Sequence, residues 1–359
     1  MNILITGGAG FIGSNLVRRM VKKYPDFRVV NLDRLTYAGN LENLRDVEGR
    51  PNYTFVKGDI KDKALVKNAF ERYGIDSVMH LAAESHVDRS ILSADEFLNT
   101  NVLGTHALLE AARSFWKDRP AGPAGRPAKA RSVFLNVSTD EVYGSLPEAG
   151  SFTESSPCAP NSPYSASKAS ADHLCRAYNK TYGVPVITTH SSNNYGPYQL
   201  PEKLIPLMVL NAMEGKPLPV YGDGLNVRDW LHVEDHCSAL EAALLKGSVG
   251  ETYNIGADNE WKNIDLIKLI CKILDELRPG SPNVPHASLI RFVKDRPGHD
   301  LRYSIDSSRM RRELGWAPSM GFEEGLKSTV EWYAGNLAWC ERARSGEYME
   351  YYEKNYMRR

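Results

Sequence analysis

The chain has 359 residues, which predicts two domains or one enlarged domain, because single cores seldom grow this large. Hydrophobic residues make up 42% and charged residues 25%, and the 44 basic and 44 acidic residues exclude a bulk attraction to nucleic acid or to an anionic membrane. We find no secretory leader and no apolar run of transmembrane length, and five scattered cysteines without a CxxC pair favour a cytoplasmic protein with free thiols.

The first elements predict a turn that binds a dinucleotide. Residues 2–6 form a short apolar strand, Gly7, Gly10 and Gly13 follow at once, and residues 14–20 have helical spacing. The glycines permit a tight turn and a close approach to a pyrophosphate, and the helix N-terminus supplies N–H groups. Glycines also make ordinary turns, so this signal alone is weak.

A second strand strengthens that prediction. Residues 29–33 end in Asp33, twenty residues after Gly13, which is the position that hydrogen-bonds the ribose hydroxyls of adenosine. An acid there repels a 2′-phosphate, so we expect NAD rather than NADP, although Arg34 softens this preference. Asp59 follows a third strand at 53–56 and either contacts the adenine amino group or caps a helix that begins at Lys61.

A fourth strand, residues 77–83, ends in small residues suited to close contact with a cofactor. We interpret His80 as a packed strand residue, whereas Ser85, just beyond the strand end, is placed to touch a substrate. Residues 93–114 read as a long helix, and the Pro/Gly-rich residues 117–129 as a loop without chemistry.

The central stretch is a buried apolar strand, residues 133–138, followed by Thr139, Asp140 and Glu141. Ligands bind outside the carboxyl ends of parallel strands, so these side chains lie where a bound molecule would be. Both acids reach one substrate only if the strand stops near Ser138 and the chain turns. The alternative is an ordinary helix N-cap.

Tyr164 and Lys168 are a candidate base and its helper. Pro163 begins a helix, which places the two side chains one turn apart on the same face. We expect the ammonium to favour the phenolate and lower the pKa of the phenol. An accidental pair on an exposed helix is the alternative.

The second half begins after a strand at 184–190 and contains further short elements. Lys203, Arg228 and Arg296 lie in or beside its polar turns and are candidate phosphate ligands, although each alone is more often a solvated surface charge. His232, Asp235 and His236 do not form a convergent ligand set, so we expect no metal.

The chain resembles the extended short-chain dehydrogenase/reductase family through GGAGFIG, STDEVYG, YSASKAS, SNNYGPYQ and DRPGHDLRY. The resemblance implies a Rossmann-like doubly wound parallel sheet, with an NAD-binding domain at 1–190 and a smaller nucleotide-sugar-binding α/β domain at 191–359, the chain crossing between them. It implies dehydration of dTDP-glucose on a deoxysugar pathway such as that to dTDP-rhamnose.

The resemblance also implies roles. Tyr164, helped by Lys168, takes the proton of the sugar C4 hydroxyl while hydride leaves C4 for NAD. Glu141 removes the C5 hydrogen, Asp140 protonates the departing C6 hydroxyl, and Thr139 hydrogen-bonds the C4 oxygen. One carboxyl must be ionised and the other protonated, and their adjacency separates their pKa values.

The implied binding residues fall into two groups. The cofactor contacts are Gly7, Gly10, Phe11, Ile12, Gly13, Asp33, Arg34, Leu35, Thr36, Asp59, Ile60, Leu81, Ala82, Ala83, Ser85, Thr100, Tyr164, Lys168 and Asn194. The nucleotide-sugar contacts are Ser85, Thr139, Asn193, Lys203, Leu204, Pro219, Tyr221, Arg228, Asn263, Arg296 and His299. A homodimer through the helices near 97–115 and 165–181 is implied as well.

Rival functions remain. An epimerase of the same superfamily needs Tyr164 and Lys168 but no acid pair after Thr139. Dehydratases of GDP-mannose or CDP-glucose share the chemistry and differ in the base pocket. A cofactor-sensing regulator needs none of these groups together.

Overall fold

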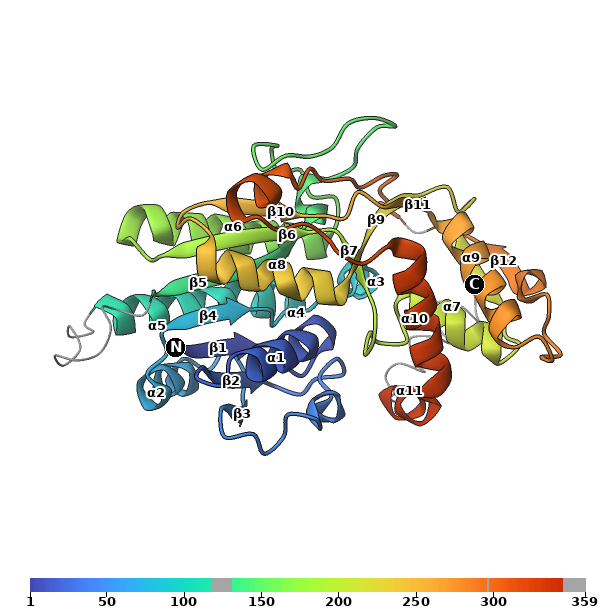
Figure 1. The fold of residues 1–359 in the computed structure, drawn as a ribbon. Coiled ribbons are helices and arrows are strands. Elements are labelled where there is room, and N and C mark those ends of the chain that lie inside the picture. The colour runs from blue at the N-terminus through green and yellow to red at the C-terminus, as the bar shows by residue number, and fades with distance from the viewer. Residues whose placement is uncertain (118–130, 296, 345–359) are drawn as a thin grey trace.

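The computed structural model of the protein describes residues 1–117, 131–295 and 297–344. Its larger part is a seven-stranded sheet in the order β10-β6-β5-β4-β1-β2-β3 (Figure 1). Every neighbouring pair in this sheet is parallel. The strands are β1 (Asn2–Thr6), β2 (Arg28–Asp33), β3 (Tyr53–Lys57), β4 (Ser77–His80), β5 (Val133–Thr139), β6 (Val186–Ser191) and β10 (Thr252–Ile255).

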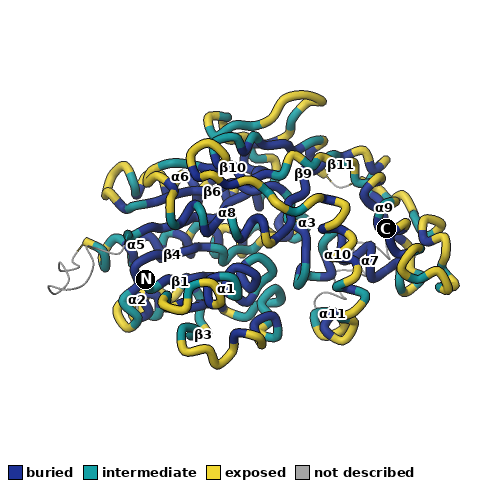
Figure 2. The backbone as a smooth tube through the Cα atoms, in the orientation of Figure 1, coloured by how far each residue is buried: buried dark blue, intermediate teal, exposed yellow. Residues whose placement is uncertain are grey.

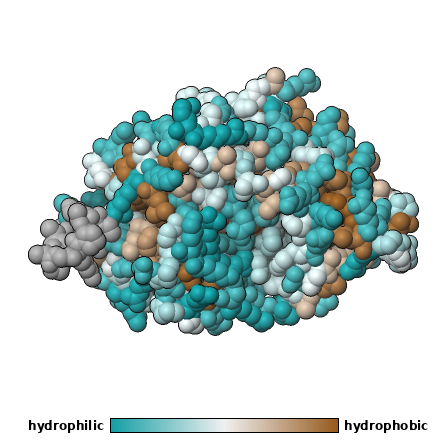
Figure 3. Space-filling model, viewed as in Figure 1, coloured by the Kyte–Doolittle hydropathy of each residue, from teal (hydrophilic) through white to brown (hydrophobic). Residues whose placement is uncertain are grey.

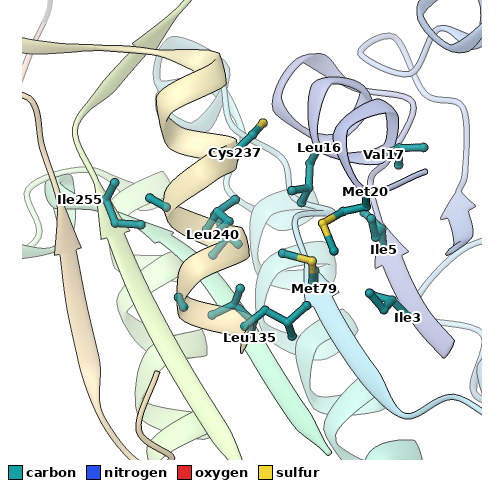
Figure 4. Packing of buried hydrophobic residues seen from close by; sticks show 14 of the residues in the cluster. Ile3, Ile5, Leu16, Val17, Met20, Met79, Leu135, Cys237, Leu240 and Ile255 are labelled. Carbon is teal, nitrogen blue, oxygen red and sulfur yellow. The ribbon is translucent and has the colours of Figure 1, made fainter. Parts of the chain in front are cut away.

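Helices cover both faces of this sheet. One face carries α1 (Phe11–Lys23) and α8 (Val233–Lys246), and the other carries α2 (Lys63–Tyr73), α5 (Thr105–Lys117) and α6 (Pro163–Tyr182). Successive strand residues point to opposite sides, so Ile3 and Ile5 pack on the face of α1 and α8 (Figure 4), whereas Leu4 packs on the other face. The strands are therefore buried, and exposure concentrates in the connections (Figure 2).

The second half of the chain builds a smaller α/β part around its own apolar core, which includes Leu210, Trp230, Leu266 and Tyr333. A three-stranded sheet has the order β11-β9-β7, and β12 pairs with β8. The elements are β7 (Asn193–Tyr195), α7 (Leu204–Met213), β8 (Leu218–Tyr221), β9 (Val227–His232), β11 (Glu260–Lys262), α9 (Asn263–Leu277), β12 (Ile290–Val293), α10 (Phe322–Gly335) and α11 (Leu337–Ala343).

The predicted fold class, a doubly wound parallel sheet with a smaller α/β part, is confirmed. The division of the chain near residue 190 stays a prediction. Two elements that follow this point, α8 and β10, pack on or join the larger sheet, so the chain crosses between the parts.

The remaining short elements refine the sequence prediction. They are η1 (Leu41–Leu44), α3 (Val87–Leu92), α4 (Asp95–Phe97), η2 (Leu98–Gly104), η3 (Asp140–Tyr143), η4 (His286–Leu289) and η5 (Met310–Leu314). The long helix expected at 93–114 begins at Asp95 and continues through α4 and the π-helical η2 into α5. The strand expected at 77–83 is shorter, because residues 81–83 leave the sheet to line a cleft. Most of the loop expected at 117–129 lies outside the described residues.

The surface seen in Figure 3 is largely hydrophilic, with smaller apolar areas between the polar ones. Within the ranges described above, no helix has the length and apolar character needed to cross a membrane.

Candidate active site

A cleft of about 320 Å³ lies along the carboxyl ends of the strands in the larger sheet. The strand order of this sheet reverses between β1 and β4, which is where ligands bind in such sheets. It brings together predicted residues that follow strands of this sheet with others that lie on α1, η2 and α6. Those that line it are Gly7, Gly10, Phe11, Ile12, Gly13, Asp33, Arg34, Thr36, Asp59, Ile60, Leu81, Ala82, Ala83, Ser85, Thr100, Thr139, Asp140, Glu141, Tyr164, Lys168, Asn193, Asn194 and Lys203.

The turn after β1 is a cradle that only glycine can build. Gly7 has a φ of +71°, and a Cβ there would lie 2.7 Å from the Ala82 nitrogen. A Cβ on Gly13 would lie 2.1 Å from the Gly7 oxygen. Because α1 begins at Phe11 without a side-chain cap, its first N–H groups remain for a ligand. The turn therefore fits the pyrophosphate of a dinucleotide.

Asp33 ties the end of β2 to this cradle. Its carboxylate accepts hydrogen bonds from the Ala9 nitrogen at 2.9 Å and from the Leu35 nitrogen at 2.8 Å. Burial raises the pKa of Asp33, and these two hydrogen bonds lower it. The carboxylate thus shapes the turn, and its contact with a ribose stays a prediction. Leu35 itself is not among the residues that line the cleft.

Asp59 caps the turn that precedes α2, because its carboxylate accepts a hydrogen bond from the Lys61 nitrogen at 2.9 Å, but it does not cap α2 itself. Helix α2 begins at Lys63, and the Asp62 side chain caps it by accepting from the Ala64 and Leu65 nitrogens, each at 3.0 Å. Asp59 instead lies in the cleft, 3.3 Å from a guanidinium nitrogen of Arg34. Its contact with adenine stays a prediction.

Strand β5 ends at Thr139, and the 3₁₀ helix η3 begins with Asp140 and Glu141. This turn brings both acids to the cleft, although neighbours on a strand would point apart. Thr139 also caps η3, because its hydroxyl accepts from the Glu141 nitrogen at 3.3 Å. Capping and placement in the cleft therefore coexist at this residue.

The Asp140 carboxyl is set up to hold its proton. The residue is 2% exposed, and its Oδ2 has no hydrogen-bond partner among the described residues. Burial raises the pKa of Asp140 well above its usual range, and the charges of Glu141 and Asp229 raise it further. Arg228 and the Thr139 hydrogen bond oppose this rise. The role of Asp140 as the acid stays a prediction.

Tyr164 and Lys168 share one face of α6, which Ser162 caps and Pro163 begins. The expectation that Lys168 lowers the pKa of Tyr164 is wrong for this structure. Burial raises the pKa of Tyr164 far above its usual value, the charge of Glu141 raises it further, and a hydrogen bond with Thr139 lowers it. The Lys168 Nζ instead donates to the Val137 oxygen at 2.8 Å.

A buried network behind Lys168 was missed by the sequence analysis. Asp172 accepts hydrogen bonds from Asn136 at 2.7 Å and from the Ser138 hydroxyl at 2.8 Å. The His190 Nε2 lies 3.1 Å from the same carboxylate. Asp172 follows Lys168 by one helical turn. Burial lowers the pKa of Lys168 below its usual value, and the charge of Asp172 opposes that fall. The spacing of Lys168 and Asp172 on one helix was the sequence signal that could have indicated this network.

Two histidines near the cleft serve packing. His80 lies between the hydroxyls of Thr6 and Thr105, at 2.8 and 2.9 Å, and burial lowers its pKa to about 3. The His236 Nδ1 lies 2.8 Å from the amide oxygen of Asn194, and burial lowers its pKa to about 3 as well. In the portion of the chain that is described, no group of three or more His, Cys, Asp or Glu residues could hold a metal ion.

Several predicted nucleotide-sugar ligands lie away from the cleft-lining set, and Arg296 lies outside the described residues. The described ones are Leu204, Pro219, Tyr221, Arg228, Asn263 and His299. The Tyr221 hydroxyl lies 3.4 Å from an Asp88 oxygen, and its ring lies 6.1 Å from that of His299. Tyr221 therefore lies next to α3, with His299 beside it. Arg228, in contrast, lies near enough to Asp140 for its charge to lower the pKa of that acid.

Arg228 is held differently from a surface phosphate ligand. It is 5% exposed, and its guanidinium donates to the backbone oxygens of Val227 at 2.7 Å and Asp300 at 2.9 Å. It also stacks over the Tyr303 ring, 4.2 Å from the centroid. Its binding of a phosphate stays a prediction, as do the roles of the other site residues.

Comparison with known proteins shows the family of this chain. The chain belongs to the GDP-mannose 4,6 dehydratase family, whose model matches residues 4–329. It is 55% identical over 349 residues to a dTDP-glucose 4,6-dehydratase of Neisseria meningitidis serogroup B, covering 96% of this chain and 97% of the relative. It is 53% identical to the enzyme of that name from Salmonella typhimurium, covering 99% of both chains.

Solved structures agree with these relatives. The dTDP-glucose 4,6-dehydratase DesIV of Streptomyces venezuelae, with NAD and TYD bound, has a TM-score of 0.86 and 48% identity, covering 96% of this chain and 100% of that chain. A Thermotoga maritima UDP-glucose 4-epimerase with UDP-glucose has a TM-score of 0.80 and 28% identity, covering 94% and 100%. The family resemblance expected from the motifs is confirmed.

Asp140→Asn should stabilise the protein increasingly as pH rises. The pKa of Asp140 is higher in the folded protein than in the unfolded chain. The free energy of unfolding of the parent protein therefore falls as pH rises from the ordinary carboxyl pKa toward the raised one. The amide removes this cost, which amounts to about 1.4 kcal/mol for each unit by which the pKa is raised. Urea unfolding at several pH values measures the difference, with the exposed Asp26→Asn as the control. A pH-independent difference from the parent protein contradicts this electrostatic interpretation.

Proposed function

We propose that the protein is an NAD-dependent dTDP-glucose 4,6-dehydratase, which converts dTDP-glucose to dTDP-4-keto-6-deoxyglucose and water. The observation that carries this proposal is the acid pair Asp140 and Glu141 beside Tyr164 in a cleft that also contains a dinucleotide turn. Relatives of nearly full length carry this name, and three related structures hold NAD. The product, a 4-keto-6-deoxy sugar nucleotide, suits a deoxysugar pathway such as that to dTDP-rhamnose.

The two parts of the chain divide the binding in this proposal. Residues 1–190 bind NAD, with the turn around Gly7 and Gly13 holding the pyrophosphate and Asp33 the adenosine ribose. Residues 191–359 bind most of the nucleotide sugar, and Ser85 and Lys203 meet across the cleft, where the Lys203 Nζ donates to the Ser85 oxygen at 3.2 Å. Bound there, NAD would supply the acceptor for a hydride from sugar C4 and the donor of the same hydride to C6.

The chain's own residues handle the protons. Tyr164 accepts the proton of the C4 hydroxyl as its phenolate and becomes the phenol, and Thr139 hydrogen-bonds the C4 oxygen. The resulting ketone acidifies the C5 hydrogen, which Glu141 removes as base. Asp140, kept in its acid form by burial and by the neighbouring charge, protonates the departing C6 hydroxyl. Glu141 then returns a proton to C5.

The acid pair also separates this function from its rivals. An epimerase requires no group to expel a hydroxyl, so it has no need of a protonated Asp140 beside Glu141. A cofactor-sensing regulator requires neither a buried acid nor a base in its cleft. Dehydratases of other nucleotide sugars share the chemistry and are distinguished by the substrate.

A homodimer and a cytoplasmic location belong to the proposal. Leu98 and Leu103 on η2 are 50% and 55% exposed, and Tyr182 at the end of α6 is 55% exposed, which supports an interface near 97–115 and 165–181. All five cysteines are free, which suits a reducing compartment. Sedimentation equilibrium should return twice the mass of the chain, and a single-chain mass contradicts the dimer.

A substrate panel tests the assignment of the sugar nucleotide. We expect dTDP-glucose to give the 4-keto-6-deoxy product with a kcat/KM at least about tenfold above those of UDP-glucose, CDP-glucose and GDP-mannose, since ~1.4 kcal/mol of base recognition suffices for that ratio. Product formation is followed by nuclear magnetic resonance. Preferential turnover of GDP-mannose or CDP-glucose contradicts the assignment of dTDP-glucose.

Glu141→Gln should separate oxidation at C4 from elimination. The amide cannot take the C5 proton, so reduced nicotinamide appears and persists, and product formation falls by about 10²–10⁴-fold, the usual contribution of a general base. Stopped-flow absorbance and product analysis measure both quantities. The matched variant Tyr164→Phe should slow the appearance of reduced nicotinamide itself. Normal product formation by Glu141→Gln removes this residue from its role.

A further inference from the structure

A buried chain of hydrogen bonds joins the helix that carries Tyr164 and Lys168 to the turn that carries the acid pair. It begins at Asp172 on α6, one helical turn after Lys168. It passes through His190 on β6 and reaches Tyr143, the last residue of η3. All three side chains of this chain are buried, so bulk water cannot readily take the place of any partner.

The contacts along this chain are short. The His190 Nε2 lies 3.1 Å from the Asp172 Oδ2, and the His190 Nδ1 lies 2.6 Å from the Tyr143 hydroxyl oxygen. The Tyr143 hydroxyl donates to the Asn254 Oδ1 at 2.8 Å. The amide nitrogen of Asn254 donates to the Phe152 oxygen at 3.1 Å, which fixes the orientation of this amide. The oxygen of Asn254 therefore faces Tyr143 as an acceptor.

These contacts determine where the hydrogens of the chain lie. Burial raises the pKa of Tyr143 well above its usual value, so the phenol keeps its hydrogen. Because that single hydrogen is donated to Asn254, the His190 Nδ1 must donate to the Tyr143 oxygen. Asp172 already accepts from two other side chains, as a carboxylate does, so the His190 Nε2 donates to it as well. Both ring nitrogens of His190 thus act as donors, one toward α6 and one toward η3.

We propose that His190 is a positioning residue for the acid pair, which it holds in place relative to Tyr164 by tying Tyr143 to Asp172. His190 is not among the residues that line the cleft, so it acts through its neighbours. The turn η3 has only four residues, Asp140–Tyr143, so a displacement of its last residue also displaces the two carboxyls at its start.

This link bears on one half of the proposed reaction, on which the inference rests. Oxidation at C4 requires Tyr164 and Lys168 on α6, whereas elimination requires Asp140 and Glu141 on η3. Loss of the link leaves the phenol and the ammonium on their helix but removes one of the contacts that hold the turn. We therefore expect elimination to slow more than oxidation does, which a general loss of stability would not produce.

Tyr143→Phe removes the hydroxyl but keeps the ring, which stacks on Phe152 with centroids 5.1 Å apart. In a single turnover of dTDP-glucose by the full chain with NAD, reduced nicotinamide should appear at a rate within about twofold of the parent protein. Its disappearance, which follows elimination, should slow on the order of 10-fold, because small displacements of catalytic groups are costly. The control is Tyr253→Phe on β10, a buried tyrosine whose hydroxyl contacts Ser248 and Glu313, and both rates should stay unchanged there.

His190→Gln tests the same link from its centre. Its single amide nitrogen cannot lie beside both Asp172 and Tyr143, so the disappearance of reduced nicotinamide should slow as it does in Tyr143→Phe. The double variant should be no slower than the slower single variant, because both changes remove one shared link.

A ratio of the two rates equal to that of the parent protein, or a stronger effect on the appearance of reduced nicotinamide, overturns the positioning role. Additive slowing in the double variant overturns it as well. Where one single variant does not fold, the ratio of the two rates in the other decides. Failure of the parent protein to form the 4-keto-6-deoxy product contradicts the proposed function instead, so the two failures are distinguishable.

Discussion

Two adjacent carboxyl groups at the buried end of β5 are the constraint on which the site depends. Burial raises the pKa of Asp140, and the charge of the adjacent Glu141 raises it further, so ionisation of both carboxyls is costly. The same cost creates the chemistry, because one acid can serve as proton donor while the other serves as base. The 3₁₀ turn η3 makes the arrangement possible by ending the alternation of the strand at Thr139.

The phenol of Tyr164 responds to the same charges. Glu141 raises its pKa in addition to burial, so the acid pair and the candidate base form one electrostatic unit rather than two separate devices. Lys168 is anchored on the oxygen of Val137 in β5, and the Asp172 network anchors the same stretch of strand through Asn136 and Ser138. The helix α6 thus positions the phenol, the ammonium and the end of the strand together.

Local patterns predicted the larger sheet well, because its signals are contained in short stretches. The glycine turn at Gly7, the strand that ends in Asp33 and the end of β5 at Thr139 can each be recognised from a short stretch of sequence. None of them requires knowledge of tertiary contacts. Contacts between distant residues were not predictable. The Arg228 guanidinium donates to the oxygen of Asp300, and the Tyr221 hydroxyl meets Asp88, so neither side chain could be placed from its neighbours. The predicted lowering of the Tyr164 pKa was wrong for a related reason. Burial depends on the whole fold, and it raises this pKa despite the neighbouring Lys168.

The most direct test of the account follows one hydrogen atom. If C4 is oxidised and the same hydride returns to C6, then dTDP-glucose that carries deuterium at C4 must give a 4-keto-6-deoxy product with that deuterium in its C6 methyl group. Mass spectrometry and nuclear magnetic resonance of the product locate the label. Retention of the label at C4, or its loss to solvent, contradicts the account.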